Sequence, residues 1–478
     1  MRMTAERTLR SFGGCRIGTV FGACPNFLAV SLIEVVIELF APRLSDGIIR
    51  KLSHLHPKGT NMKVLLIAIG TRGDVQPFVV LGHALAARGH DVSIAAANSF
   101  SKMIDAAGLR HCMLPVDFQE LMQEPEIKAA MTTFTGKLKA YRWASEAMND
   151  QLDTTWAIGQ DVSPDLILHH PKGALAPYLA RKLGAYSVPV MLQPGFVPTG
   201  EYPQFLIASR SLGKLGNLAS HRLILEVMRF GTSMMVNRWR KASLPDLGSP
   251  MDPLKGYSPK GNAPRIHAYS EAIVPRPANW PKTEVQTGYF FAEQEPFTPP
   301  ESLKSFLEAG PPPVYFGFGS MPDIYGKRIG DAVAFAVEQL GLRAVIATGW
   351  GGITEIDVGE NVHVLDAVPH AWLFPRVSAV VHHGGSGTTH EGLRWGRASV
   401  VCPLFGDQPF FGQRVANLGA GPPPVAQKRM TAEKLTAALK TALSGQVRDC
   451  AAGIGIKLRA EDGVARACDL VEHFAFGR

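Results

Sequence analysis

The chain has 478 residues, 46% of them hydrophobic and 19% charged, which is the composition of a globular protein longer than one ordinary core. Two domains are therefore expected. The formal net charge of +8 excludes little by itself, but no recognised nucleic-acid-binding module accompanies it, which argues against a nucleic-acid partner. The six cysteines are scattered without paired spacing, so they indicate reduced thiols in a cytoplasmic protein rather than a disulfide framework.

Residues 1–61 form an extension whose role the sequence does not define. The uncharged stretch Ile17–Ile33 is too short and too interrupted by glycine and proline to predict a transmembrane helix. Arginines precede it, as in a signal peptide, but no good small-residue cleavage site follows. Leu28–Phe40 fits an amphipathic helix. A new domain begins at Asn61, and Met62 would make a natural start codon, so we expect the extension to be dispensable.

Residues 62–290 read as a first parallel α/β domain. The apolar run "MKVLLIAIG" predicts a strand, and "TRGDVQPFVVLGHALAARGH" predicts a loop and a helix before a second strand at Asp91–Ala96. Similar strands follow at "PDLILHH", "YSVPVMLQP" and "RIHAYS". A dinucleotide oxidoreductase also begins this way, but "GTRGD" lacks the G-x-G-x-x-G spacing and "AAAN" lacks the acidic ribose ligand. That class is therefore disfavoured.

The segment 209–241 carries most of the basic excess of the chain. It holds seven basic residues against the single acidic residue Glu226, and bulky apolar residues are interleaved among them. This pattern predicts an interfacial helix pair in peripheral contact with an anionic membrane. An ordinary core-facing helix with a solvated basic face is the open alternative.

Residues 291–312, "FAEQEPFTPPESLKSFLEAGPP", are proline-rich and read as a linker. A second α/β domain, 313–455, then runs through "VYFGFGS", "RAVIATG", "VHVLDAV", "SAVVHHGG" and "ASVVCPLF". Residues 456–478 are expected to form a C-terminal helix that packs back across the cleft between the domains. Ligands in such sheets bind at the carboxyl ends of the strands.

The stretch "AVVHHGGSGTTHEG", Ala379–Gly392, predicts a strand, a glycine turn and a helix, which is a layout that binds phosphate. Glycine lets the backbone approach a ligand, and the first helix amides attract an anion. His382 and His383 add imidazole donors, and serine and threonine add hydroxyls. A metal pair is disfavoured because successive strand residues point to opposite faces. A plain structural turn is the other alternative.

Several motifs in order carry a family resemblance: "GTRGDVQP", "HHPK", "MLQPGFVPTGEYP", "GFGSM", "TGWGG", "VPHAWLFPRVSAVVHHGGSGTT" and "PLFGDQPFFGQRVANLGAG". From about Met62 onward the chain resembles the sterol glucosyltransferases and the related bacterial glycosyltransferases of glycopeptides, macrolides and other lipophilic aglycones. The resemblance implies a GT-B fold of two Rossmann-like domains. The first would bind the acceptor, and the second would bind a nucleotide-diphosphate sugar.

The resemblance also implies roles for individual residues. Asp74 would be the catalytic base. Glu391 matches only the plant small-molecule branch, where a glutamate contacts the ribose, and Trp350 would replace that branch's base-stacking tryptophan unless it is a core residue. The expected donor contacts are His383, Ser386, Gly387, Thr388 and Ser320 at the diphosphate, Val368, Glu391 and Trp350 at the base and ribose, and Asp407 and Gln408 at the sugar.

The acceptor pocket is expected from Pro171–Tyr178, Leu192–Phe205 and the basic segment, with His170 and Pro194 among its contacts. Its apolar character favours a lipophilic acceptor such as a sterol, a lipid or a polyketide. Asp74 could instead cap the following helix, and His170 could either assist the base or be packed in the core.

Together these features predict an inverting hexosyltransferase that moves a hexose, with UDP-glucose as the expected donor, to a hydroxyl of the acceptor. No metal or other cofactor is expected, because a helix N-terminus and His383 would offset the charge of the leaving diphosphate and no Asp-x-Asp pair occurs. The alternative donor and acceptor are a dTDP-deoxysugar and a polyketide or glycopeptide aglycone. An epimerase or hydrolase on the same fold, and a non-catalytic binding protein, are the rival classes.

Overall fold

The computed structural model describes residues 61–121, 134–244, 251–252, 254–293, 297–319, 325–348 and 359–476, and only the backbone of residues 134–147 and Gln119. The predictions for residues 1–60, and the roles predicted for Ser320 and Trp350, lie outside these residues. Among the described helices, none combines the length and the apolar character that crossing a bilayer requires.

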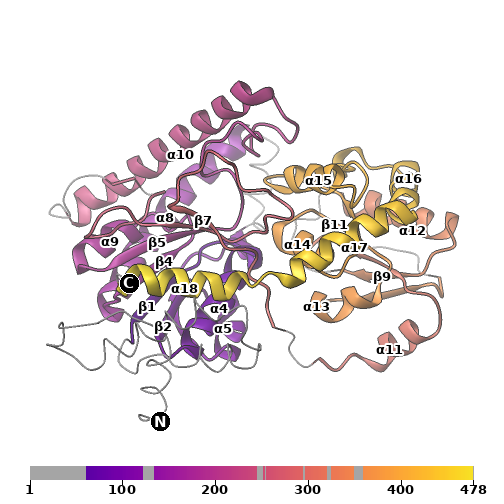
Figure 1. The fold of residues 1–478 in the computed structure, drawn as a ribbon, viewed down its shortest axis with the longest axis horizontal. Helices are drawn as coiled ribbons and strands as arrows, with labels where there is room; N and C mark the ends of the chain where they lie inside the picture. The colour runs from indigo at the N-terminus through magenta and orange to yellow at the C-terminus, as the bar shows by residue number, and fades with distance from the viewer. Residues whose placement is uncertain are drawn as a thin grey trace, which may run out of the picture. The chain divides into compact units, whose positions relative to one another are not determined.

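The first half of the described chain is built on a seven-stranded parallel sheet with the order β3-β2-β1-β4-β5-β6-β7 (Figure 1). This is a doubly wound order, in which the chain reverses direction between β1 and β4. The strands are β1 (Lys63–Ile67), β2 (Asp91–Ala97), β3 (Arg110–Leu114), β4 (Leu166–His169), β5 (Tyr186–Met191), β6 (Arg265–His267) and β7 (Glu284–Gln286).

Helices cover both faces of this sheet because its central strands are apolar on both faces. Val64 and Leu66 of β1 belong to a core cluster on one face, whereas Leu65 and Ile67 belong to a cluster on the other face. The helical elements of this half are α4 (Arg72–Ala87), η2 (Asn98–Phe100), α5 (Ser101–Ala106), α6 (Phe118–Leu121), α8 (Phe134–Val162), α9 (Ala176–Leu183) and α10 (Gly213–Ser243).

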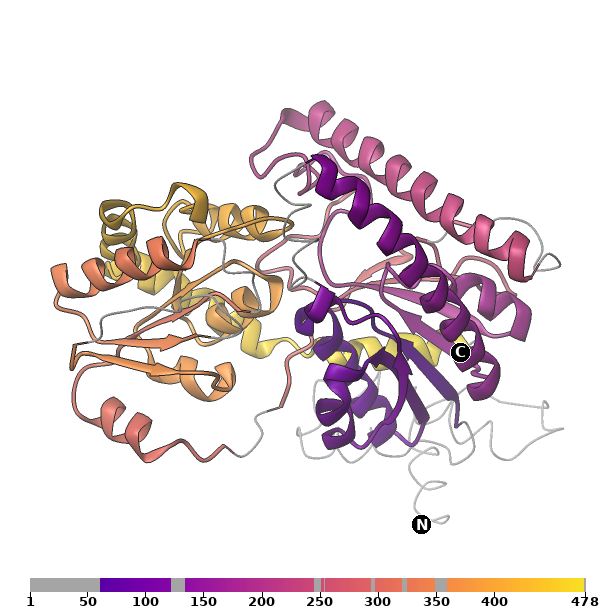
Figure 2. The same cartoon turned by 180° about the vertical axis from the view of Figure 1, so that it is seen from behind.

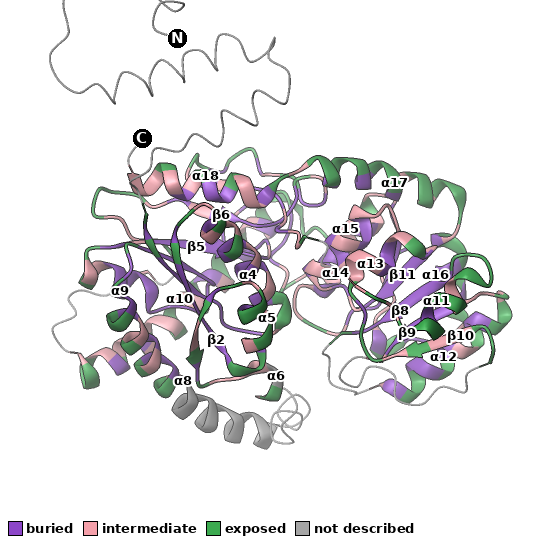
Figure 3. Ribbon diagram, turned by 90° about the horizontal axis from the view of Figure 1, so that it is seen from below, coloured by how far each residue is buried: buried purple, intermediate pink, exposed green. Residues whose placement is uncertain are grey.

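The second half contains a five-stranded parallel sheet with the order β10-β9-β8-β11-β12. Figure 3 shows that buried residues concentrate in the strands of both sheets. The strands are β8 (Val314–Gly317), β9 (Ala344–Ala347), β10 (Val362–Leu365), β11 (Ala379–His382) and β12 (Ala398–Val401). The helical elements are α11 (Glu301–Glu308), α12 (Gly326–Gln339), α13 (His370–Leu373), η3 (Phe374–Arg376), α14 (Ser386–Arg394), α15 (Gln408–Asn417), η4 (Gln427–Arg429), α16 (Ala432–Ala442) and α17 (Gly445–Ala460).

The last helix, α18 (Gly463–Phe476), packs on α4 of the first half, whereas the preceding α17 packs on α14 of the second (Figure 1). Arg88 at the end of α4 pairs with Asp469 at 2.6 Å and with Glu472 at 3.0 Å. The chain passes from the second half to the first at residues 461–462, between α17 and α18. The sequence placed the end of the second domain at residue 455, but α17 continues through that position without a break.

Three features of this fold differ from the sequence-based expectations. The predicted linker 291–312 contains α11, whose Leu303 is buried in a cluster of the second half with Phe306 and Leu307 packed against it. Apolar residues three and four positions apart make this helix amphipathic despite the flanking prolines.

The predicted helix pair at 209–241 is instead the single helix α10, because the glycines within it, Gly216 and Gly231, do not break it. Strands β3 and β7 were not predicted.

Candidate active site

The strand-to-helix turns at the carboxyl ends of β1, β4 and β11 carry most of the predicted site residues. Strands β1 and β4 are paired directly, with Ile67 opposite His169, so the segments that follow them start side by side. Strand β11 pairs in the same way with β8, which brings Gly319 next to His383. Sheet order therefore explains why residues that are far apart in the sequence meet, 98 positions in the case of Asp74 and Lys172.

The turn between β11 and α14 requires glycine. Gly384 has a φ of +93°, and a Cβ atom there would lie 2.5 Å from Val401 Cγ1. A Cβ atom on Gly385 would lie 2.6 Å from His383 Nε2. The ring of His383 therefore occupies space that side chains at the glycine turn would fill, and the turn leads directly into the first amides of α14.

His383 has an unsatisfied polar atom at this turn. Its Nδ1 is buried and has no hydrogen-bond partner among the described residues. Burial lowers the pKa of His383 to about 4, so the imidazole is neutral at pH 7 and acts through hydrogen bonding rather than through charge. The ring of His382 lies 6.3 Å away at 89°, and its Nδ1 accepts the Gly384 N–H at 3.1 Å. The two rings therefore face different environments.

The first turn of α14 also contacts the first half of the chain. Ser386 Oγ donates to Leu192 O at 3.3 Å, so this hydroxyl is already engaged. A Cβ atom on Gly387 would lie 2.9 Å from Tyr289 Oη, and the Tyr289 ring stacks on His390 at 4.4 Å. Thr388 is half-buried in the same turn, and its side chain makes no hydrogen bond to another described residue. The amides of residues 386–388 occupy the positions that have no partners inside a helix.

His390 was missed by the sequence analysis. Its Nδ1 lies 2.7 Å from Ser386 O, and its Nε2 accepts the Ser270 N–H at 3.2 Å. The first contact requires the proton on Nδ1, so one neutral tautomer satisfies both. Ser270 in turn donates its hydroxyl hydrogen to Glu461 at 2.7 Å. His390 lies one helical turn after Ser386, and this i, i+4 spacing was the sequence signal that could have placed His390 beside the first turn of α14.

Asp74 is the third residue of α4 and caps that helix. Its Oδ2 accepts the Thr71 N–H at 3.0 Å, and the Thr71 side chain completes a capping box. The helix therefore begins at Arg72, and Thr71 rather than Asp74 is the N-cap. Gly70 has a φ of +144°, and a Cβ atom there would lie 2.0 Å from Asp74 Oδ2. The alternative that Asp74 caps the helix is therefore partly right: Asp74 is not the N-cap residue, but its carboxylate accepts the N–H of the N-cap residue Thr71.

The other contacts of Asp74 come from the segment after β4. Lys172 Nζ lies 3.0 Å from Asp74 Oδ2, and His170 Nε2 lies 3.4 Å from Asp74 Oδ1. Burial alone would raise the pKa of Asp74, but the positive charge of Lys172 and the adjacent His170 side chain hold it well below its ordinary value. The carboxylate is therefore ionised at neutral pH. Lys172 belongs to the predicted acceptor region, but its pairing with Asp74 was not predicted.

The tautomer of His170 follows from its neighbours. The backbone N–H of Lys172 donates to His170 Nδ1 at 3.2 Å, so a neutral ring carries its proton on Nε2, on the side of Asp74 Oδ1. Burial lowers the pKa of His170, which keeps the ring neutral despite the nearby carboxylate. His170 Nε2 lies beside the carboxylate but makes no hydrogen bond to the described residues, and the ring is packed against Phe78 with ring centroids 6.4 Å apart.

Charges from the two halves act on one another near these turns. Burial and the negative charge of Asp74 raise the pKa of Asp407 to about 7. Burial and the positive charge of Arg72 lower the pKa of His370 to about 3. The carboxyl group of Asp407, at the N-cap of α15, therefore lies within the electrostatic range of the Asp74 corner.

Gln408 and Glu391 are engaged inside their own elements. Gln408 Oε1 accepts the backbone N–H groups of Leu404 at 2.8 Å and Phe405 at 3.2 Å, so it shapes the turn before α15. Glu391 accepts the Trp395 indole N–H at 2.7 Å and lies 3.6 Å from Arg394. Burial raises the pKa of Glu391, with Arg394 opposing the shift. Among the described residues, the hydrogen bond and the ion pair of Glu391 go to Trp395 and Arg394 and not to His383.

Val368 lies between β10 and α13 and is buried in a core cluster with Phe374, so its predicted role rests on its backbone groups. Pro194 is buried in the segment after β5. The next residue, Gly195, has a φ of +131°, and its carbonyl faces His221 Nδ1 at 3.4 Å. The segment that holds Pro194 is therefore packed against α10.

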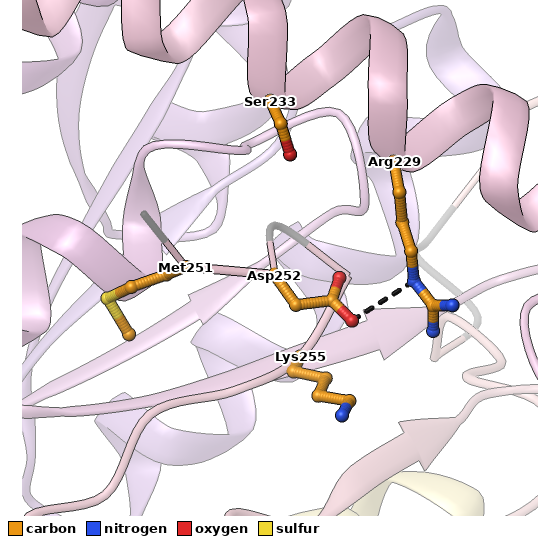
Figure 4. Close-up of a pocket in the computed structure, with 5 residues that line it drawn as sticks. All are labelled: Arg229, Ser233, Met251, Asp252 and Lys255. Carbon is orange, nitrogen blue, oxygen red and sulfur yellow. Dashed lines mark ion pairs between the residues drawn. The ribbon is translucent and has the colours of Figure 1, made fainter. Parts of the chain in front are cut away.

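A pocket of about 290 Å³ opens elsewhere, between α10 and the segment 251–255 (Figure 4). An ion pair of 3.1 Å between Arg229 Nε and Asp252 Oδ2 crosses it. The pocket is formed by Arg229, Ser233, Met251, Asp252 and Lys255. Arg229 and Ser233 belong to the basic segment that was expected to contribute to the acceptor pocket, whereas His170, Pro194 and the predicted donor residues do not line it. Within the described residues, no group of three or more His, Cys, Asp or Glu side chains is placed to hold a metal ion.

Comparison with known families and structures defines the class of this protein. Residues 64–183 match the glycosyltransferase family 28 N-terminal domain, and residues 351–465 match the erythromycin biosynthesis protein CIII-like C-terminal domain. The fold is similar to that of the calicheamicin glycosyltransferase CalG4, with a TM-score of 0.62 and 18% identity over 88% of this chain and 99% of that one. The spinosyn forosaminyltransferase SpnP gives a TM-score of 0.62 and 17% identity over 87% and 100%. The fold is GT-B, as the sequence predicted.

Sequence relatives identify the family. The sterol 3-beta-glucosyltransferase UGT80A2 of Arabidopsis thaliana is 32% identical over 461 residues, which cover 93% of this chain and 70% of that protein. The sterol 3-beta-glucosyltransferase of Pichia angusta is 32% identical over 92% of this chain, which spans only 36% of that longer protein. The chain belongs to the sterol 3-beta-glucosyltransferase family and is a hexosyltransferase of the UDP-glycosyltransferase type. The predicted family and enzyme class are thus confirmed.

Proposed function

We propose that this protein transfers glucose from UDP-glucose to a hydroxyl of a sterol or similar lipophilic acceptor, with inversion and without a metal ion. The observation that carries the proposal is the arrangement around Asp74 in a chain of this family: a buried, ionised carboxylate that is fixed by Thr71 and Lys172. Such a group can take a proton from an acceptor hydroxyl, and its position at the end of β1 fits the binding edge of a parallel sheet.

In the proposed reaction, the acceptor oxygen attacks the anomeric carbon as its proton passes to Asp74. The bond from that carbon to the diphosphate oxygen breaks, and its electron pair leaves with UDP. Single displacement inverts the anomeric carbon. His170 is proposed as a positioning residue, because its Nε2 lies 3.4 Å from Asp74 Oδ1 and a small shift would let it donate there. The pairing with Lys172 makes Asp74 a weak base, so we expect acceptor binding to displace the ammonium from Oδ2 and thereby to raise the pKa of Asp74.

On the donor side, His383 and the first amides of α14 are proposed to bind the diphosphate. The buried Nδ1 without a partner and the free helix positions at Ser386–Thr388 support this role. Donors of this kind can offset charge on the leaving group without a divalent cation. Asp407 and Gln408 are proposed at the sugar, and Val368, Glu391 and Trp350 at the base and ribose, with Ser320 beside the phosphates. Glu391 would have to leave Trp395 in order to reach a ribose.

On the acceptor side, the segment of Pro194 and the residues after His170 are proposed to line the acceptor site. Their burial and apolar character suit a lipophilic molecule. Such an acceptor partitions into lipid, so we also propose that residues 209–241 contact an anionic membrane.

The test is mass spectrometry of reactions that contain the purified chain, a panel of uridine and thymidine diphosphate sugars, and a pool of sterols, lipids and polyketide aglycones. We expect a sterol to gain one hexose from UDP-glucose in the presence of a chelator. Transfer of only a thymidine-linked deoxysugar to a polyketide would overturn the donor and acceptor. Donor hydrolysis without any glycosylated product would leave the donor site and remove the proposed acceptor.

A further inference from the structure

Helix α10 has one buried face, which holds the segment 195–204. Asn217 Nδ2 donates to Gly200 O at 2.9 Å, and the Ser220 hydroxyl accepts the Gln204 N–H at 3.0 Å. His221 Nε2 lies 3.1 Å from Tyr202 O. The helix is also tied to the chain after it, because Arg229 pairs with Asp252 (Figure 4). The inner face of α10 is therefore fixed to the segment proposed to line the acceptor site.

The opposite face of α10 exposes an apolar stripe. Its members are spaced three or four positions apart once the small residue Ala219 is included, so they form one line along the helix. Most large hydrophobic residues that are exposed in the described chain belong to this stripe or to the loop just before it. The α10 stripe consists of Leu212 (50% exposed), Leu215 (84%), Leu223 (58%), Val227 (60%), Phe230 (72%) and Met234 (52%), and Leu206 (54%) and Ile207 (46%) precede it.

Basic residues accompany the α10 stripe. Arg222 and Arg238 are exposed on its two flanks, and Lys241 is exposed at its end. Figures 1 and 2 both show α10 at the outer margin of the ribbon. The one acidic residue of α10, Glu226, is also exposed beside the α10 stripe, and it pairs with Arg229 at 2.8 Å, so the border of the stripe keeps an excess of positive charge. The occupant that matches an apolar line with such a border is a lipid surface with anionic headgroups. A second copy of this chain would bring the same basic flanks together, and this repulsion disfavours it.

We propose that α10 lies flat on an anionic lipid surface through the α10 stripe, and that its inner face thereby holds the 195–204 segment at that surface. Apolar side chains enter the headgroup boundary, while Arg222 and Arg238 pair with lipid phosphate or carboxylate groups. The lipid contact itself needs no sugar chemistry. That a sterol then enters the acceptor site from the lipid rests on the proposed function.

The binding test uses the full chain with vesicles of phosphatidylcholine that contain or lack phosphatidylserine. We expect co-sedimentation with the anionic vesicles at low salt, and weaker binding as salt rises or phosphatidylserine is removed. The double variant Leu223→Glu/Phe230→Glu should weaken binding by at least about tenfold, because two apolar side chains no longer enter the boundary.

The matched control is Ile456→Glu, which places the same charge on an apolar residue of α17 that is 64% exposed. It should bind vesicles as the unaltered chain does. Equal binding by the stripe variant and the unaltered chain would overturn the proposal. A stripe-dependent dimer in sedimentation velocity, without vesicle binding, would assign the surface to a second copy instead.

A rate measurement separates this inference from the proposed function. With sterol embedded in anionic vesicles, the stripe variant should turn over at least about tenfold more slowly than the Ile456→Glu control. Leu223 and Phe230 are exposed and do not belong to the buried face of α10 that holds the 195–204 segment, so they are not expected to touch a bound acceptor. With sterol dispersed in detergent, the two variants should therefore have similar rates, which also shows that the stripe variant folds. Vesicle binding without turnover of any sterol would refute the acceptor and keep the lipid contact. Equal loss in vesicles and in detergent would refute the link between α10 and lipid-borne acceptor.

Discussion

The turns β1–α4 and β11–α14 share a strand–turn–helix layout but differ in charge. In the first, Asp74 occupies the helix N-terminus with its own carboxylate, which accepts the Thr71 N–H. In the second, the first turn holds no acidic residue, and the neutral ring of His383 stands beside it. A helix N-terminus that is filled by a carboxylate repels an anion, whereas an unfilled one attracts it. The same backbone thus presents a base at one turn and an anion site at the other.

The strongest test of this contrast is Asp74→Asn. The amide keeps the size of the side chain and can still accept the Thr71 N–H, but it cannot take a proton. We expect kcat to fall by about 10²- to 10⁴-fold while the donor Kd stays unchanged. Steady-state rates and calorimetric titration with UDP-glucose check both parts. Near-normal turnover would remove Asp74 from the role of base.

The converse change at the other turn is His383→Ala. It deletes the imidazole beside α14 and should weaken UDP-glucose binding by about tenfold to a hundredfold, because a hydrogen bond to a charged phosphate is lost. Titration with UDP-glucose measures the effect, and Asp74→Asn serves as the control for the binding step. An unchanged donor Kd together with an unchanged rate would contradict the phosphate assignment.

A smaller change concerns the counter-ion of the base. Lys172→Met removes the charge that lowers the pKa of Asp74, so that pKa should rise. A base works only when it is deprotonated, and the acidic limb of the pH profile of kcat/KM should therefore move to higher pH. Lys172→Arg keeps the charge and should leave the limb in place. Identical profiles for the Met and Arg variants would mean that Lys172 does not tune Asp74.

The smallest expected effect is the contribution of Asp407 to the pH dependence of the free energy of unfolding. Its pKa is raised from 3.8 to about 7, so the folded chain holds this proton more tightly than the unfolded chain does. The resulting stabilisation is present below about pH 4 and is lost as the pH rises to about 7. Asp407→Asn should flatten this part of the profile, and Asp74→Asn should reduce it by removing the neighbouring charge. Urea unfolding across this pH range measures it, and three parallel profiles would exclude the coupling.

Sequence patterns predicted those parts of the fold that depend on local order. Apolar runs such as Leu65–Ile67 are buried on both faces and were found as strands. Strand β3 has only one buried residue among its five, and β7 has a single apolar residue between Glu284 and Gln286, so neither stood out. The turn at Gly384–Gly385 was also predictable, because Gly384 adopts a positive φ that favours glycine, and consecutive glycines in the sequence signal such a turn. These elements place the predicted His383 and Asp74 at strand ends.

The partners of the site residues could not be predicted, because they come from distant segments. Lys172 meets Asp74 across 98 positions, and Ser270 meets His390 across 120. The first contact depends on the pairing of β1 with β4, and the second depends on the packing of α14 against the segment after β6. Local patterns encode neither. The contacts of Glu391 with Trp395 and of Gln408 Oε1 with Leu404 and Phe405 are local, three or four positions apart, so the sequence held a signal for them that the prediction of ligand roles did not use.

The return of α18 to the first half also constrains how the protein is made. Ala467, Cys468 and Val471 belong to the same buried cluster as Val64 and Leu66 of β1. Domains usually fold in the order in which they leave the ribosome. Here the core beneath α4 stays incomplete until residue 471 has been synthesised, after the whole second sheet. The helix that carries Asp74 therefore acquires its final packing only near the end of translation, and the emerging first half exposes apolar surface until then.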